Sequence, residues 1–216
     1  MSVLHIFDMD GTLLQGTTAS LEIANALGCE DEFHTFEHAF GSGKMAASVF
    51  AQHAFTLWRA LTPEIVRDLT ENGPWINGIA EVFTDIRERG EKSLVITMSP
   101  DFFANHLLSM GADKVCASRF PAPPFSGELD VSGILAPEAK VTIAQDMLRG
   151  SSPRLDVSVA YGDSASDVPL FLRMKNTVSI NGDAQIESCA GICYRGDDLR
   201  DAYAAARAKY LMVKSW

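Results

Sequence analysis

The chain has 216 residues, of which 47% are hydrophobic and 21% charged, and its formal net charge is −10. This composition is typical of a globular protein and excludes a disordered chain. The negative charge and the absence of a Lys- or Arg-rich cluster argue against nucleic-acid binding, so a small-molecule partner is expected.

The cysteines and the apolar segments predict a reducing setting. The four cysteines include no Cys-x-x-Cys pair and predict packed thiols instead of a zinc site. The apolar run after Met1 has no basic flank and is interrupted by Asp8, so no signal peptide is predicted. No segment approaches the ~20 apolar residues of a membrane span. We expect a cytoplasmic protein that binds no membrane; the sequence does not distinguish a monomer from a homodimer.

The first predicted element is a buried strand over residues 3–7, "VLHIF". Asp8 and Asp10 follow it directly, and Gly11 and Thr12 continue the turn. A buried ionised carboxylate without a partner is very costly, so this pair predicts a cation or a strong set of donors nearby. His5, inside the strand, is expected to be a hydrogen-bonded core residue.

Residues 17–74 contain no strand pattern. The last of four helical segments there begins with Thr62 as N-cap and Pro63 at the first helical position. The four segments are "SLEIANALG", "FHTFEHAFG", "KMAASVFAQHAFTLWRAL" and "TPEIVRDLTENG". We expect a helical cap domain over 17–74, inserted into an α/β core formed by residues 1–16 and 75–216.

The rest of the chain alternates strands and helices, which predicts a doubly wound parallel sheet with helices on both faces. Strands are expected at 93–97, 114–117, 157–161, 177–180 and 191–194, and helices at 76–90, 101–110, 137–149 and 199–216. Residues 119–136, rich in Pro and Gly, are expected to form a loop with a short hairpin.

Polar residues follow several of these strands, and ligands of open parallel sheets bind beyond the strands' carboxyl ends. The segment "VSVAYGDSASD" ends in Asp163 and Asp167, and "LVITMSPDFF" carries Thr97 and Ser99 before a predicted helix. With the two N-terminal aspartates, four carboxylates are expected at one edge of the sheet. Hard oxygen ligands at this density suit Mg²⁺ with a substrate phosphate.

These residues resemble the motifs of the haloacid dehalogenase superfamily. "DMDGTL" is similar to its first motif, D-x-D-x-T; Ser99 matches the second motif, Lys140 the third, and Gly162, Asp163 and Asp167 in "GDSASD" the fourth. The inserted helices resemble the C1-type cap of the phosphoserine-phosphatase-like branch of subfamily I. The resemblance extends from the first strand to about residue 181 and implies a phosphatase.

The resemblance also implies a role for each motif residue. Asp8 is the implied nucleophile and forms an aspartyl phosphate, while Asp10 acts as general acid and base. Ser99 binds phosphate oxygens together with nearby amides, and Lys140 neutralises charge on the phosphoryl group. The second aspartate favours phosphoryl transfer over carbon–halogen cleavage.

For the metal, the resemblance implies Mg²⁺ held by Asp8, the backbone carbonyl of Asp10 and Asp163. Asp167 is expected to orient Lys140 or the metal ligands. Alternative interpretations stay open at three positions: Ser99 as a helix N-cap, Thr97 as the residue of the second motif, and Lys140 as an exposed helix lysine.

The substrate-recognition residues of phosphoserine-hydrolysing relatives are not found here. Their amine-binding Glu corresponds to Thr17, and their carboxylate-binding Arg falls near Ala54, beside His53 and about one turn from Arg59. Thr17, His53 and Arg59 are therefore candidate substrate-binding residues of a different specificity.

Pro100 stands after Ser99 where many relatives have Gly, and it lacks an N–H. The donor role toward phosphate is therefore expected to pass to the amide of Asp101. His34 and His38, four residues apart on a predicted helix, have no third ligand that would indicate a metal site.

The sequence favours a Mg²⁺-dependent phosphomonoesterase that acts on a small phosphorylated metabolite. Two alternatives remain: a phosphotransferase or mutase with the same aspartate nucleophile, and a non-catalytic module that binds a phosphorylated metabolite. The leaving alcohol is not predicted, and phosphoserine is one candidate.

Overall fold

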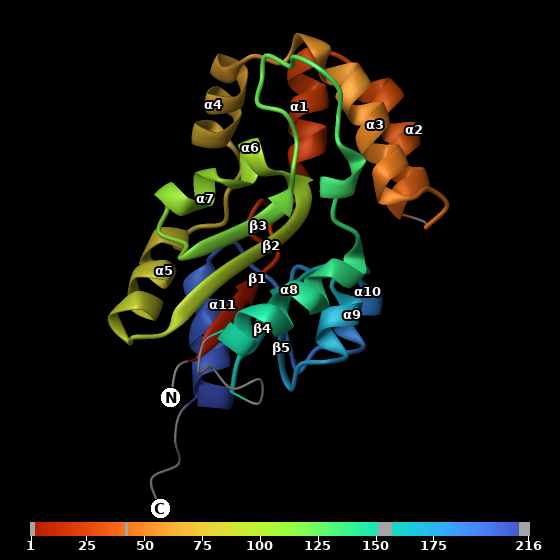
Figure 1. Ribbon diagram of the computed structural model, residues 1–216. Coiled ribbons are helices and arrows are strands. Elements are labelled where there is room, and N and C mark those ends of the chain that lie inside the picture. Colours follow the sequence, from red (N-terminus) through yellow and green to blue (C-terminus); the bar gives the residue numbers. More distant parts are fainter. Residues whose placement is uncertain (1–2, 42, 151–156, 212–216) are drawn as a thin grey trace, which may run out of the picture.

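The computed structural model describes residues 3–41, 43–150 and 157–211. At its centre is a six-stranded sheet in the order β3-β2-β1-β4-β5-β6, with every neighbouring pair parallel (Figure 1). This strand order is that of doubly wound α/β proteins, so the predicted fold class is confirmed. The strands are β1 (Leu4–Phe7), β2 (Lys92–Pro100), β3 (Lys114–Ser118), β4 (Val159–Gly162), β5 (Asn176–Ile180) and β6 (Ile192–Tyr194).

Helices cover both faces of the sheet. In β1, Phe7 belongs to one apolar core and Leu4 and Ile6 to the other, because successive side chains of a strand point to opposite faces. The first core includes residues of α5 (Ile79–Glu88), α6 (Asp101–Ala104), α7 (His106–Ser109) and α11 (Leu199–Ala206). The second includes residues of α8 (Pro137–Gly150), α9 (Val168–Phe171) and α10 (Ala184–Glu187).

Between β1 and α5 the described chain is helical, as predicted, and these helices lie beyond the carboxyl ends of the strands (Figure 1). The predicted N-cap is confirmed, since the hydroxyl of Thr62 accepts a hydrogen bond from the amide of Ile65 at 3.3 Å. Thr18 caps α1 in the same way. The elements are α1 (Ala19–Leu27), α2 (Glu30–Gly41), α3 (Ala47–Leu57), η1 (Trp58–Ala60) and α4 (Pro63–Asn72).

Three predicted elements differ from those in the structure. Residues 119–136 form no hairpin. The Arg119 amide donates a hydrogen bond to the Gly133 carbonyl at 2.9 Å, which joins the two ends of the loop. The only regular element of the loop is a 3-10 turn, η2 (Val131–Gly133). Its prolines lack the N–H groups that a ladder needs. The helix expected over 101–110 is divided into α6 and α7. The C-terminal helix ends as a π-helix over Arg207–Leu211 (η3), and its expected remainder lies outside the described residues.

The loop after β3 contacts the helices between β1 and β2 through aromatic rings. Phe125 packs on Phe55 of α3, with ring centroids 4.7 Å apart, and Phe120 on Trp58 at 6.0 Å. Phe102 of α6 also contacts both loop rings. These contacts hold the helices against the carboxyl ends of the strands. Within the described part of the chain, no helix is long and apolar enough to cross a membrane.

His5 is a buried core residue with hydrogen bonds, as predicted. Its Nδ1 lies 3.0 Å from the Tyr161 hydroxyl and its Nε2 3.0 Å from Oε2 of Glu91. Glu91 also pairs with Arg207 at 2.7 Å, which ties the C-terminal helix to β1. Burial lowers the pKa of His5 below 6.5, more than the neighbouring Glu91 raises it. His5 is therefore neutral in the folded protein at neutral pH.

A pH-dependent loss of stability is expected from His5. Below its ordinary pKa of 6.5 the unfolded chain binds a proton that the folded chain excludes, so stability is present above this pH and is lost as pH falls. Urea unfolding at several pH values measures this for the parent protein and for His5→Gln. As pH falls, the free energy of unfolding of the parent should decrease more steeply than that of the variant, by up to ~1.4 kcal/mol per pH unit. Parallel declines would contradict this.

Candidate active site

Asp8 lies at the end of β1, between β2 and β4. Its amide donates to the Tyr161 carbonyl at 2.9 Å, which continues the ladder and fixes the backbone. Its side chain is buried, and Oδ1 lies 2.7 Å from Nζ of Lys140 on α8. The same Nζ lies 2.6 Å from Asp167 Oδ1 and 3.3 Å from Ser166 Oγ. Lys140 is thus a buried cation between two carboxylates, which excludes the exposed helix lysine of the sequence analysis.

Burial and neighbouring charges shift the pKa values of both Asp8 and Lys140. Burial and the neighbouring Asp167 raise the pKa of Asp8, and Lys140 only partly opposes them. For Lys140, burial acts to lower the pKa, but the carboxylates of Asp167 and Asp8 outweigh it and raise the pKa. Lys140 therefore stays protonated at neutral pH, and it is the one cation that contacts Asp8 and Asp167 among the described residues.

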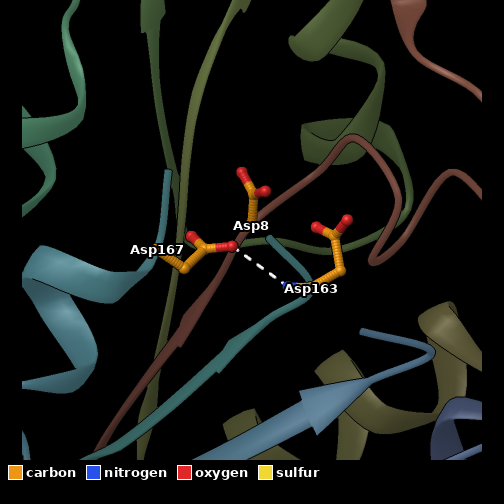
Figure 2. Close-up of side chains that lie close together, drawn as sticks. All are labelled: Asp8, Asp163 and Asp167. Carbon is orange, nitrogen blue, oxygen red and sulfur yellow. Dashed lines mark hydrogen bonds between the residues drawn. The ribbon is translucent and has the colours of Figure 1, made fainter. Parts of the chain in front are cut away.

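Asp163 follows β4 and belongs to the same group of neighbouring acids. Burial, then the neighbouring Asp167, raise the pKa of Asp163 to about 7. Its Oδ1 accepts a hydrogen bond from the Thr12 hydroxyl at 3.0 Å, and its amide donates to Asp167 Oδ2 at 3.0 Å. Figure 2 shows the Asp8, Asp163 and Asp167 side chains around one space, with Asp167 bonded to the Asp163 backbone.

Two glycines leave room for these carboxylates. A Cβ on Gly11, whose φ is +75°, would overlap the Asp163 carboxyl group. A Cβ on Gly162 would overlap the carboxyl group of Asp167. Any larger residue at either position would displace an acid from the cluster.

Asp10 is held by donors on both oxygens. Thr97 Oγ donates to Asp10 Oδ2 at 2.9 Å, and the Ala19 amide donates to Oδ1 at 2.7 Å. The Thr97 hydroxyl oxygen in turn accepts a hydrogen bond from the Ser99 amide at 3.0 Å. Thr97 therefore positions Asp10, while Ser99 lies two residues further along β2, buried at its carboxyl end. Thr97 and Ser99, which the sequence left as alternatives for the second motif, thus have different contacts, and a phosphate-binding role stays a prediction for Ser99.

The acidic cluster fits a hard divalent cation. One carboxylate oxygen from each of Asp8, Asp163 and Asp167 lies within 4.8 Å of the others. Two of these acids have raised pKa values beside a single lysine, so a cation would relieve their repulsion. Oxygen donors of this kind suit Mg²⁺, which keeps positions for water and phosphate.

The remaining candidates make contacts with protein groups. The hydroxyl of Thr17 donates to Glu22 Oε1 at 2.8 Å, and Asp101 Oδ1 accepts the Phe120 amide at 3.2 Å. His53 is exposed and stacks on Phe36, with centroids 4.3 Å apart, and Arg59 is exposed over the Phe55 ring at 4.4 Å. A substrate-binding role stays a prediction for Thr17, Asp101, His53 and Arg59.

Some contacts of the site were missed in the sequence. Thr12, the last letter of the first motif, was given no role, although its fixed place beside the acids was a usable signal. The Ala19 amide and the Ser166 hydroxyl carry no signal in the sequence, because their contacts depend on tertiary packing. His34 and His38 belong to no metal-ligand group among the described residues.

Fold and site define a class: a doubly wound α/β protein with an Asp–Lys cluster at the carboxyl ends of its central strands. A family model described as haloacid dehalogenase-like hydrolase matches residues 6–172. The chain belongs to the haloacid dehalogenase-like hydrolases, as the motifs predicted.

Individual relatives agree with this assignment. The chain is 26% identical to a phosphoserine phosphatase of Methanocaldococcus jannaschii over 200 residues, which cover 92% of this chain and 94% of the relative. It is 27% identical to the putative hydrolase ML2424 of Mycobacterium leprae over 240 residues, covering all of this chain and 78% of the relative. A solved substrate-bound phosphoserine phosphatase complex superposes with a TM-score of 0.80 at 23% identity, covering 95% and 98% of the two chains.

Proposed function

We propose that the protein is a Mg²⁺-dependent phosphomonoester hydrolase that works through an aspartyl phosphate on Asp8. One observation carries the proposal: the buried Asp8 carboxylate contacts Lys140 at 2.7 Å, and Asp10 is held two residues further on. Phosphoserine phosphatases among the relatives support the phosphatase class.

In the first step of the proposed reaction, an Asp8 oxygen attacks phosphorus as the bond to the leaving oxygen breaks. Asp10, protonated at this stage, gives its proton to that oxygen. In the second step Asp10 takes a proton from water, the water oxygen attacks phosphorus, and the bond to Asp8 breaks. Thr97 and the Ala19 amide orient Asp10, and both donate to its carboxylate, the form needed in the second step.

The remaining residues of the site act on charge and position. Lys140 stays protonated and is directed at Asp8, where it neutralises charge that develops on the phosphoryl group. Ser99 is the proposed phosphate-binding hydroxyl. Mg²⁺, held by Asp8, the Asp10 carbonyl and Asp163, would supply positive charge that lets an anionic nucleophile approach an anionic phosphate.

The proposal includes a division of the chain into domains. Residues 1–16 and 75–216 would form the core that carries the chemistry, and residues 17–74 a cap that selects the substrate and excludes water. The aromatic contacts of Phe55 and Trp58 with the loop after β3 support a closed cap. Thr17, Asp101, His53 and Arg59 remain proposed substrate contacts.

The proposed function is tested by measuring phosphate release from a panel of phosphomonoesters with and without Mg²⁺. The panel contains phosphoserine, amino-alcohol phosphates, sugar phosphates and nucleoside monophosphates. We expect release that depends on Mg²⁺. Transfer to an added alcohol, or isomerisation without free phosphate, would favour a phosphotransferase or mutase. Binding that stabilises the protein without turnover would favour a non-catalytic module.

Replacing Asp10 by Asn is expected to lower kcat by about 10²- to 10⁴-fold, the usual range for removing a general acid and base. Mg²⁺ affinity should change little, because the backbone carbonyl remains. Stopped-flow or steady-state phosphate release gives the rate, and calorimetric titration gives the metal affinity. An equal loss of affinity and rate would remove the support for the acid and base role.

A further inference from the structure

Lys140 has a third acceptor besides the two acids that it contacts. Its Nζ lies 3.3 Å from the Ser166 hydroxyl oxygen, as well as 2.7 Å from Asp8 Oδ1 and 2.6 Å from Asp167 Oδ1. A lysine ammonium has three N–H donors and no acceptor, so these three contacts use every donor of Lys140. Ser166 is the one neutral partner of the three.

A short turn holds Ser166 beside Lys140. Asp167 Oδ2 accepts hydrogen bonds from the amides of Asp163 at 3.0 Å and Ser164 at 3.4 Å, and the Asp167 amide donates to the Ser164 carbonyl at 3.0 Å. The Ser164 hydroxyl oxygen lies 3.4 Å from that of Ser166, whose side chain is half-buried. The Asp167 carboxylate thus binds Lys140 through one oxygen and fixes the turn that carries Ser166 through the other.

The three contacts of Lys140 do not stay equivalent during the proposed reaction. When Asp8 attacks phosphorus, its carboxylate becomes part of an acyl phosphate and loses the negative charge that holds the ammonium. The N–H directed at Asp8 is then free to bind a phosphoryl oxygen. Asp167 and Ser166 form no bond to phosphorus, so they are the two contacts that keep Nζ in place while charge develops on the phosphoryl group.

We propose that Ser166 is a positioning residue that holds the Lys140 ammonium in place during phosphoryl transfer. The inference rests on the proposed phosphatase function and adds a residue to it. Without the Ser166 hydroxyl, the flexible chain of Lys140 keeps only Asp167 as a partner that does not react, and Nζ swings about this single contact. The ammonium then stabilises the transition state less, while ground-state binding of the substrate changes little. The loss therefore falls on kcat and not on KM.

The test measures turnover of p-nitrophenyl phosphate at saturating Mg²⁺ and its inhibition by two anions. Orthovanadate takes the five-coordinate shape of the transferring phosphoryl group, whereas inorganic phosphate is the product. The key variant is Ser166→Ala. Ser166→Thr and Ser166→Val form a matched pair of similar shape, of which only the first keeps a hydroxyl. Ser188→Ala, at an exposed serine whose hydroxyl donates to the Gln185 carbonyl at 2.7 Å, is the control. Urea midpoints establish that each variant is folded.

We expect Ser166→Ala to lower kcat by about 10-fold, the size of one net hydrogen bond, with little change in KM. The inhibition constant of orthovanadate should rise by a similar factor, and that of phosphate should stay near the parent value. An inhibition constant does not depend on the fraction of active molecules, so partial misfolding would change neither constant. Ser166→Thr should keep most of the parent rate, Ser166→Val should lose it as Ser166→Ala does, and Ser188→Ala should match the parent.

Two results would overturn the role of Ser166 and leave the proposed function standing. One is a Ser166→Ala protein with the kcat and the orthovanadate inhibition constant of the parent. The other is equal rates for Ser166→Thr and Ser166→Val, which would show that the hydroxyl is not what holds Lys140. No turnover by the parent protein would overturn the proposed function, and the role of Ser166 with it.

Discussion

Asp8→Asn is expected to abolish turnover, with a fall in kcat of about 10⁴-fold or more. The amide has no anionic oxygen to attack phosphorus, and no second described carboxylate takes its place, because Asp167 is bonded to Lys140 and to the Asp163 backbone. Phosphate release from the best substrate of the panel measures the loss.

The fold should survive the same substitution. Asn is isosteric with Asp, and it removes one acid from a cluster in which burial and Asp167 already raise the pKa of Asp8. Lys140 keeps Asp167 as its partner. The free energy of unfolding should therefore stay within about 1–2 kcal/mol of the parent. Asp31→Asn, an exposed acid of α2, is the control, with full activity. An active Asp8→Asn protein would remove Asp8 from the nucleophile role.

Lys140→Met is expected to remove activity and to destabilise the protein strongly. Met is similar in length, but it leaves Asp8 and Asp167 buried without their cation. Removing one partner of a buried ion pair typically costs about 3–5 kcal/mol. Urea unfolding at neutral pH measures this loss, and Lys175→Met, at an exposed lysine, is the matched control with little change.

The Lys140→Met loss should depend on pH in a defined direction. Without Lys140 the pKa of Asp8, which burial already raises, rises further, so the folded variant binds a proton that the unfolded chain releases. Its stability therefore increases relative to the parent as pH falls from about 7 toward 5. A loss of the same size at both pH values would show that lost packing, and not uncompensated charge, causes the destabilisation.

Much of the catalytic half of the site could be predicted because it follows local sequence. The apolar run of β1 ends at Asp8, and the run of β4 ends at Gly162, so each acid's place at a strand end is set by a few neighbouring residues. Parallel strands then bring these ends together. Lys140 needed the family resemblance, because nothing in its helix distinguishes it from an exposed lysine.

The contacts of the helices between β1 and α5 could not be predicted, because they depend on how these helices pack. The helix containing Glu37 was predicted, but not which of its faces turns toward Thr18, since that depends on burial of Phe33 and Trp58 together. The loop after β3 was expected to form a hairpin, but its contacts with Phe55 and its prolines favour an irregular path.

The central claim is that the phosphoryl group passes through Asp8. The most direct measurement is mass spectrometry of Asp10→Asn, quenched in acid after mixing with p-nitrophenyl phosphate and Mg²⁺. This leaving group departs without a proton, so the variant forms the intermediate but hydrolyses it slowly. We predict one added phosphoryl group on the peptide that contains Asp8. Release of p-nitrophenol with no such adduct, or an adduct on another peptide, would contradict the account.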